Sequence, residues 1–165
     1  MSKSLGNVVY PQDVIDKFGA DVLRLWVTSA DYRNDMAVSE KIMGQLADTY
    51  RKIRNTFRFL LGNLYDFDPE KDSLPYEELS HLDQWILFRL HQLIPRVNKA
   101  YEKSEFHIVY HAISTFCVVD LSSFYLDITK DTLYCSGALD GERRGIQTVL
   151  FEAGSVLARL LAPVM

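Results

Sequence analysis

A short polar segment at the start of the chain carries residue types that could act on a phosphate group. Ser2, Lys3 and Ser4 place one ammonium between two hydroxyl groups. An ammonium is a compact and mobile charge, so it can follow a phosphate whose charge changes during a reaction. Because the segment has no apolar periodicity, we expect Met1–Asn7 to be a poorly ordered loop. Taken alone, Ser-Lys-Ser is a common tripeptide, and the alternative interpretation is a solvated chain terminus.

A second group of cations recurs at helical spacing further along the chain. Arg51, Arg54 and Arg58 are three and four residues apart, so they share one helix face, and Lys52 flanks them. Guanidinium groups suit the backbone phosphates of a nucleic acid. Two alternatives remain. The row is either an ordinary solvated helix face, or a structural row paired with the acidic residues of segment 66–104.

Three further residue types could carry chemistry, and each has a simpler structural interpretation. His107 and His111 have the spacing of a metal-binding pair, but no further ligands are apparent, so we predict no metal site. Asp120 lies in an apolar stretch and is predicted to be hydrogen-bonded within the fold. Cys117 and Cys135 form no C-x-x-C pair, so we expect reduced thiols. Two cysteines also cannot supply a four-cysteine zinc site.

Composition favours one globular domain. The chain has 165 residues, and 48% of them are hydrophobic, enough for a sizeable core. The net charge of −4 does not by itself indicate a nucleic-acid binder, but residues 1–65 carry 9 Lys and Arg against 7 Asp and Glu. A polyanion should therefore approach this net-positive third. No apolar run reaches membrane-spanning length and the N-terminus does not have the pattern of a signal peptide, so we expect a cytoplasmic protein without a membrane partner.

The elements that must position these residues are all predicted to be helices. Apolar residues recur at helical spacing over segments 12–18, 20–29, 39–65, 80–97, 105–133 and 142–162. Ser39 is a plausible N-cap, and Ser80 with Asp83 has the pattern of a capping box. Pro95 should bend its helix. The helix over segment 105–133 is apolar almost all round from Ile108 to Leu126, so it should lie at the centre of the bundle. The fold class is all-α, a helical bundle preceded by a small α segment.

The N-terminal residues resemble a known family. Met1-Ser2-Lys3-Ser4-Leu5-Gly6-Asn7, followed by Gly19 to Trp26, is similar to the K-M-S-K-S loop and the segment after it in class I aminoacyl-tRNA synthetases of the isoleucine, valine, leucine and methionine group. The first motif lysine is missing, so the chain is expected to begin inside the motif. The resemblance implies that Ser2, Lys3 and Ser4 bind ATP. It also implies that Lys3, matching the second motif lysine, helps stabilise the pyrophosphate leaving group.

Two longer stretches, Asp48–Leu64 and Tyr101–Tyr134, resemble the isoleucine-specific members of bacterial type, and the resemblance covers nearly the whole chain. It implies that residues 1–37 are the end of the catalytic loop with a stem-contact segment, and that 38–165 are an anticodon-binding helical bundle. By the same resemblance, Arg51, Lys52, Arg54 and Arg58 contact the anticodon stem of tRNA(Ile).

The resemblance also describes a larger enzyme. That enzyme would be a cytoplasmic monomer that uses ATP with magnesium and isoleucine, and its zinc module would lie outside this chain. The present chain lacks the nucleotide-binding fold, the H-I-G-H motif and the editing domain, so we expect it not to be catalytic alone.

Two alternatives to this interpretation remain. A valine-specific member of the same family is one, although the Tyr50–Leu64 run argues against it. A stand-alone helical module for protein interactions is the other. That module should be a complete, capped sequence with an exposed apolar groove, whereas this chain is expected to begin within a motif and to stop where the family continues.

Overall fold

The computed structural model describes Ser4 and residues 8–165. Ser2 and Lys3 lie outside the described residues, as does most of the segment Met1–Asn7 for which we expected poor order. Ser4, the one described member of that segment, is exposed. The described chain contains helices and connections but no β-strand, which confirms the all-α class.

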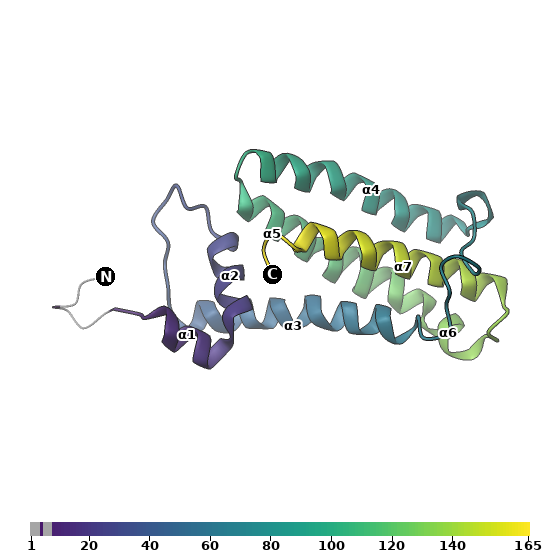
Figure 1. Cartoon of the computed structure of the whole chain (residues 1–165), viewed down its shortest axis with the longest axis horizontal. Coiled ribbons are helices and arrows are strands. Elements are labelled where there is room, and N and C mark those ends of the chain that lie inside the picture. Colours follow the sequence, from purple (N-terminus) through teal and green to yellow (C-terminus); the bar gives the residue numbers. More distant parts are fainter. Residues whose placement is uncertain (1–3, 5–7) are drawn as a thin grey trace.

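Most of the helices follow one another with short connections, and the two longer ones are residues 30–39 before α3 and residues 63–75 after it (Figure 1). Tyr10 precedes the first helix in an extended conformation, and Gly19, with a φ of 91°, separates the first two. The elements are α1 (Pro11–Phe18), α2 (Ala20–Ser29), α3 (Glu40–Gly62), η2 (Tyr76–Glu78), α4 (His81–Glu102), α5 (Phe106–Thr115), η3 (Phe116–Tyr125), α6 (Leu126–Cys135) and α7 (Gly141–Leu161).

Two of the predicted helix starts are confirmed by their side-chain hydrogen bonds. The Ser39 hydroxyl accepts from the backbone N–H of Ile42 and caps α3. Ser80 and Asp83 form the predicted capping box of α4, with each side chain bound to the other residue's backbone N–H. The end of α3 differs from the prediction. This helix stops at Gly62 rather than near Tyr65, because Asn63 caps its last carbonyls.

Two apolar clusters hold the fold together. The smaller one joins α1 and α2 to the first half of α3 through Val14, Val22 and Met43. The larger one fills the bundle between the second half of α3 and the helices that follow it. Because α3 contributes to both clusters, it connects the small N-terminal segment to the bundle (Figure 1). Two large apolar residues of the long helices lie outside these clusters and are exposed. Leu61 is at the edge of the apolar stripe near the end of α3, and Trp85 lies against Phe124 on the outer side of α4.

The predicted helix 105–133 is present, but its middle is a π-helix and it is not the central element. The N–H of Leu126 donates to the carbonyl of Leu121, five residues back, as π geometry requires. Val119, Phe124 and Ile128 are exposed, so one side of this helix faces outward. The more central helix is α7, in which the run 145–150 is entirely buried. The prediction from apolar composition, that segment 105–133 is the central helix, was therefore wrong.

The same helical run corrects our statement about membrane-spanning length. Phe106–Cys135 is long and apolar enough to cross a membrane by length and composition. Core helices of bundles pass the same test, and Cys117, Leu121 and Tyr125 of this run are fully buried against neighbouring helices.

A buried polar network closes one end of the bundle. Arg143, at the start of α7, is 4% exposed and donates two hydrogen bonds of 2.7 and 2.9 Å to the Asp66 carboxylate. Gln147 donates to the same carboxylate, and Arg144 donates to the Asp66 carbonyl. These bonds anchor the loop after α3 to α7. They also satisfy polar side chains that would otherwise be costly to bury.

Candidate nucleic-acid interface

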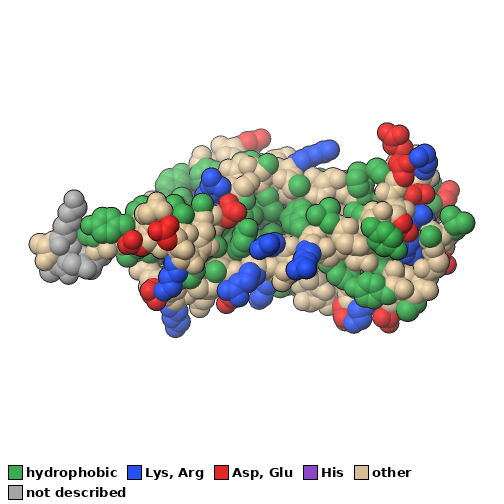
Figure 2. Space-filling view, turned by 60° about the horizontal axis from the view of Figure 1, so that its bottom comes forward, with side chains coloured by type: hydrophobic (Ala, Val, Ile, Leu, Met, Phe, Trp, Pro, Cys, Tyr) green, Lys and Arg blue, Asp and Glu red, His purple; other side chains and the backbone are tan. Residues whose placement is uncertain are grey.

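The predicted arginine row lies on the solvent side of α3. Arg51, Arg54 and Arg58 are exposed, while Ile53, on the opposite side of the helix, is buried. This arrangement follows from helical periodicity, because the apolar residues turn inward and carry the arginines outward. Figure 2 shows several Lys and Arg side chains gathered on the side of the molecule that α3 forms.

The α3 cations have few partners of their own. Arg51 forms an ion pair of 2.9 Å with Asp48, one turn earlier on the same helix, where both side chains are mostly exposed. Such a pair contributes little to stability and can exchange for another anion. Within the described residues, the side chains of Lys52, Arg54 and Arg58 have no ion pair or hydrogen bond. Their charges remain available to a ligand.

The acidic residues after α3 pair with other cations. Asp66 and Asp72 face Arg143 and Arg144, Asp68 pairs with Lys71, and the Asp83 carboxylate accepts from Ser80 and Tyr125. Among the described residues, no ion pair joins an arginine of α3 to an acid of segment 66–104. The structure therefore does not support the alternative in which the α3 row is held by segment 66–104.

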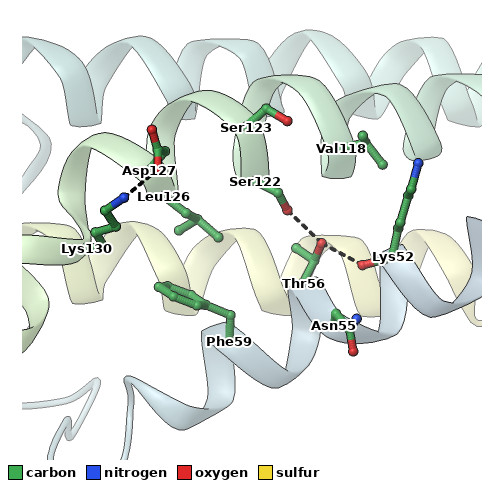
Figure 3. A pocket seen from close by; sticks show the side chains of 10 residues that line it. All are labelled: Lys52, Asn55, Thr56, Phe59, Val118, Ser122, Ser123, Leu126, Asp127 and Lys130. Carbon is green, nitrogen blue, oxygen red and sulfur yellow. Dashed lines mark hydrogen bonds and ion pairs between the residues drawn. The ribbon is translucent and has the colours of Figure 1, made fainter.

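A groove runs beside the cationic row, between α3 and the π-helix η3. Its volume is about 510 Å³. Lys52 and Lys130 stand at its two ends, and the Thr56 and Ser122 hydroxyls meet in its floor at 3.0 Å (Figure 3). Asn55 adds an amide to the lining. The remaining residues add a second serine, a carboxylate and apolar side chains; they are Ser123, Asp127, Phe59, Val118 and Leu126.

The groove presents hydrogen-bond donors between two ammonium groups. Lys130 is held at 2.7 Å by Asp127, one turn earlier, and this hydrogen bond raises the pKa of the Lys130 ammonium. Lys52 has no such partner. The combination of ammonium, hydroxyl and amide donors suits phosphate oxygens and ribose hydroxyls, and it carries no nucleophile–base pair of the kind that catalysis would require.

The sequence predicted one member of this groove, Lys52, and missed the others. Asn55 lies four residues after Arg51 and three before Arg58, but it was missed because its side chain carries no charge. Other polar residues of the lining come from η3 and α6, more than sixty residues further along the chain; they are Ser122, Ser123 and Lys130. No local pattern links them to α3, so only the packing of η3 on α3 reveals the groove.

The remaining candidates are elsewhere. His107 and His111 lie on α5, away from the α3 groove, and no set of three potential metal-ligating side chains was found among the described residues. Asp120 forms an ion pair of 3.3 Å with Arg89, so its predicted bonding within the bundle is confirmed. Cys117 is buried and Cys135 exposed, and both are free thiols. For the predicted ATP-binding set, the structure describes only Ser4.

Comparison with known proteins gives consistent results along the chain. The family model for the anticodon-binding domain of tRNA ligase matches residues 83–165, and that for class I tRNA synthetases (I, L, M and V) matches residues 1–39. Isoleucine–tRNA ligases of Desulforamulus reducens and Moorella thermoacetica are each 61% identical over all 165 residues, and that of Petrotoga mobilis is 54% identical. The chain spans 18% of the length of these curated relatives.

One solved structure shares the fold. It is the crystal structure of the ternary LeuRS–tRNA–LeuAMS complex from Agrobacterium radiobacter K84. The TM-score is 0.73 at 22% sequence identity, and the match covers 99% of this chain and 19% of that one. At this identity the match shows a common fold over almost the entire chain.

Proposed function

Because this chain belongs to the family of anticodon-binding domains of tRNA ligases, we propose that it binds the anticodon stem of tRNA(Ile) through α3 and the groove beside it. The exposed and unpartnered cations Lys52, Arg54 and Arg58 carry this proposal. The names of the relatives, all isoleucine–tRNA ligases, favour the isoleucine tRNA over the valine tRNA.

The chemistry of this surface suits positioning an RNA rather than reading its sequence. Arg54 and Arg58 are one turn apart, so they can meet successive phosphates along a strand. Lys52 and Lys130 would take further phosphates at the ends of the groove. The Ser123 hydroxyl and the Asn55 amide can bond ribose hydroxyls, which distinguish RNA from DNA. An A-form stem is recognised largely through such backbone contacts.

We further propose that the chain is part of an isoleucine–tRNA ligase that uses ATP with magnesium and works as a cytoplasmic monomer. In this proposal residues 1–37 complete the catalytic loop and contact the stem, and residues 38–165 form the anticodon-binding bundle. The matches of the two family models, at 1–39 and 83–165, support this division. Ser2, Lys3 and Ser4 would bind ATP, with Lys3 acting on the leaving pyrophosphate. No zinc would be held here, because one of the two cysteines is buried and the other exposed.

The RNA-binding proposal is tested by removing the α3 charges. Arg54→Gln with Arg58→Gln should weaken binding of a tRNA(Ile) transcript by roughly three- to tenfold. It should also reduce the slope of log affinity against log salt by about two units, because each lost phosphate contact accounts for roughly one. Arg159→Gln is the matched control, since it removes an exposed charge that lies on α7 and outside the lining of the α3 groove.

The same variants separate binding from a structural role. If the arginines stabilise the bundle instead, the double variant should unfold at a lower temperature and keep the parent salt slope. A binding role predicts an unchanged melting temperature, because these side chains are exposed and make no bond that holds another helix.

The role proposed for Lys3 is tested in the full-length enzyme. Lys3→Ala should slow the single-turnover rate of adenylate formation and have less effect on tRNA binding, because its ammonium is proposed to act in the transition state. An unchanged rate would exclude that role and leave the proposed function of α3 untouched.

A further inference from the structure

Four large apolar side chains lie exposed on one side of the bundle, and we propose that they dock a helix of the same polypeptide that follows these 165 residues. They are Trp85 and Phe88 of α4, Phe124 of η3 and Ile128 of α6, called here the aromatic patch. Each is between 37% and 56% exposed. The inference rests on the proposal that this chain is part of a longer isoleucine–tRNA ligase.

The aromatic patch is continuous across two helical elements. The Trp85 and Phe124 rings meet edge to face, with their centroids 5.1 Å apart. Phe88 follows Trp85 by three residues and Ile128 follows Phe124 by four, so each pair occupies one helix face. Because α4 and η3 pack directly against each other, the two pairs form adjacent apolar stripes. A surface of this kind accepts the apolar face of a third, amphipathic helix.

The patch side chains are not part of the core that α4 already provides. This helix buries Ile86, Leu90 and Val97 toward the bundle. The outward face of a surface helix is normally polar, and single exposed apolar residues are common on any protein. An adjoining group of large apolar side chains on the outward face is different, because it marks a surface that another element covers.

The chemistry of the patch also differs from that of the α3 surface. Its four side chains carry no charge, and none of them lines the α3 groove. The charged residues next to it in the chain, Arg89 and Asp127, are paired with Asp120 and Lys130. A polyanion would gain little here, whereas an apolar helix face would remove the aromatic side chains from water.

The course of α7 supports a following helix as the occupant. α7 starts beside the start of α4, where Gly145 lies close to the Asp83 carboxylate. It ends beside the other end of α4, where the Tyr101 hydroxyl donates to the Leu160 carbonyl at 2.7 Å. At Leu161 the chain is therefore at the end of the bundle away from the patch (Figure 1). A following antiparallel helix about as long as α7 would return along the bundle to the patch.

The relatives are long enough to supply this helix. The chain spans 18% of the length of the curated relatives, so more than four fifths of such a polypeptide lies outside it. A segment tethered to the bundle reaches the patch at a high effective concentration. For this reason we infer an intramolecular occupant rather than a second copy of the chain.

Hydroxyl-radical footprinting with mass spectrometry tests the inference, because it reports how exposed individual aromatic side chains are. In the 165-residue chain, Trp85, Phe88 and Phe124 should be oxidised readily. In the full-length enzyme their oxidation rates should fall several-fold, at every protein concentration. A version of the enzyme that ends at Met165 should react like the isolated chain. Tyr125, which is fully buried, should stay unreactive in all three and so report an intact bundle.

Substitutions within the patch provide a second measurement in the full-length enzyme. Phe88→Ser with Ile128→Ser should raise the oxidation of Trp85 toward its rate in the isolated chain, because the covering helix loses apolar contacts. Leu139→Ser is the matched control. It removes an apolar side chain that is 92% exposed and lies outside the patch, so the protection of Trp85 should be unchanged.

Several results would overturn the proposal. Equal oxidation of the patch in the isolated chain and the full-length enzyme would show that nothing covers it, and so would protection that the double serine variant leaves intact. Protection that persists in the version ending at Met165 would assign the cover to the preceding polypeptide. Protection that grows with concentration, together with a dimer in sedimentation velocity, would assign it to a second copy. Protection of the isolated chain by a tRNA(Ile) transcript would assign the patch to RNA.

The footprint needs neither RNA nor ATP, so its outcome is independent of the binding proposed for α3. If the native protein in cell extracts has only the mass of this chain, the proposal of a longer ligase fails and this inference fails with it. Equal oxidation in a longer enzyme would instead refute this inference alone.

Discussion

The arginines of this chain fall into two groups that differ in burial and partners. Arg143 is 4% exposed and fully engaged by Asp66, whereas Arg54 and Arg58 project into solvent without a partner in the described structure. The first kind of arginine holds loop and helix together, and the second kind is available to a phosphate. Their different environments predict different responses to substitution.

We expect Asp66→Asn to be strongly destabilising. It would leave the buried Arg143 guanidinium without its carboxylate, and breaking a buried ion pair costs about 3 kcal/mol or more. Urea unfolding at neutral pH measures this loss. Asp68→Asn, which removes an exposed carboxylate paired with Lys71, is the control and should change stability by less than about 1 kcal/mol. Similar losses for the two variants would contradict the structural role of Arg143.

The Arg143–Asp66 ion pair should also make the stability of the fold depend on pH in the acidic range. The hydrogen bonds from Arg143 lower the pKa of Asp66 in the folded protein to about 2, from an ordinary value of 3.8. A carboxyl whose pKa is lower in the folded protein stabilises the fold at pH values above the pKa that it has in the unfolded chain. This stabilisation disappears as the pH falls from about 4 to about 2. Unfolding free energies of the parent and Asp66→Asn should therefore differ most near neutral pH and converge near pH 2. A constant difference across this range would show that the pair does not control the response.

The two cysteines should react very differently with thiol reagents. Burial raises the pKa of the Cys117 thiol to about 12, so almost no thiolate exists at neutral pH, while Cys135 is exposed. Ellman's reagent should label one thiol rapidly in the native chain and the second only after unfolding. In Cys135→Ser the rapid phase should be absent. Two rapid thiols in the native parent would be incompatible with the packing around η3.

At the scale of elements, the start of α4 joins local capping to long-range packing. The Asp83 carboxylate, 2% exposed, accepts hydrogen bonds from Ser80 within the capping box and from Tyr125, forty-two residues later. Burial and the neighbouring carboxylate raise the pKa of Tyr125, so its hydroxyl stays protonated and donates. One side chain thus caps the start of α4 and fixes η3 against this helix.

Ser80→Ala should consequently cost more than an ordinary surface substitution. It removes the cap of α4 and one donor to a buried carboxylate, so we expect a loss of about 1–2 kcal/mol. Ser136→Ala is a suitable control, because Ser136 ends α6 without a side-chain hydrogen bond in the described structure. Thermal unfolding of both variants gives the comparison, and equal melting temperatures would argue against the capping box as a stabilising feature.

At the scale of the whole molecule, the chain is a scaffold that presents cations along α3. It carries an excess of acidic residues overall, with a net charge of −4. Its basic character is therefore local, in the α3 row. An acidic molecule with one basic edge can orient a polyanion, because the acidic surface repels it elsewhere.

The isolated chain should not activate isoleucine. Only Ser2, Lys3 and Ser4 match residues of the ATP site, and one motif of three residues cannot position the reacting groups. We expect no isoleucine-dependent pyrophosphate exchange above a heat-treated control, while RNA binding is retained. Exchange that persists in a preparation carrying Lys3→Ala would point to a contaminating enzyme, and exchange that this variant abolishes would refute the expectation.

The sequence alone determined the features that depend on neighbouring residues. Helical periodicity located the helices and placed Arg51, Arg54 and Arg58 away from the core, and the capping patterns at Ser39 and Ser80 located two helix starts. These predictions succeeded because a residue's position on a helix face, and the bond from a cap to the first turn, are decided within a few residues.

The tertiary structure decided everything that joins distant segments. The Thr56–Ser122 contact spans sixty-six residues and the Arg143–Asp66 pair seventy-seven, so neither has a local signature. For the same reason, composition pointed to segment 105–133 as central, while the structure buries α7, whose polar residues Arg143 and Gln147 find partners after α3. Burial depends on which partners the folded chain supplies, and the groove beside α3 exists only because η3 packs along this helix.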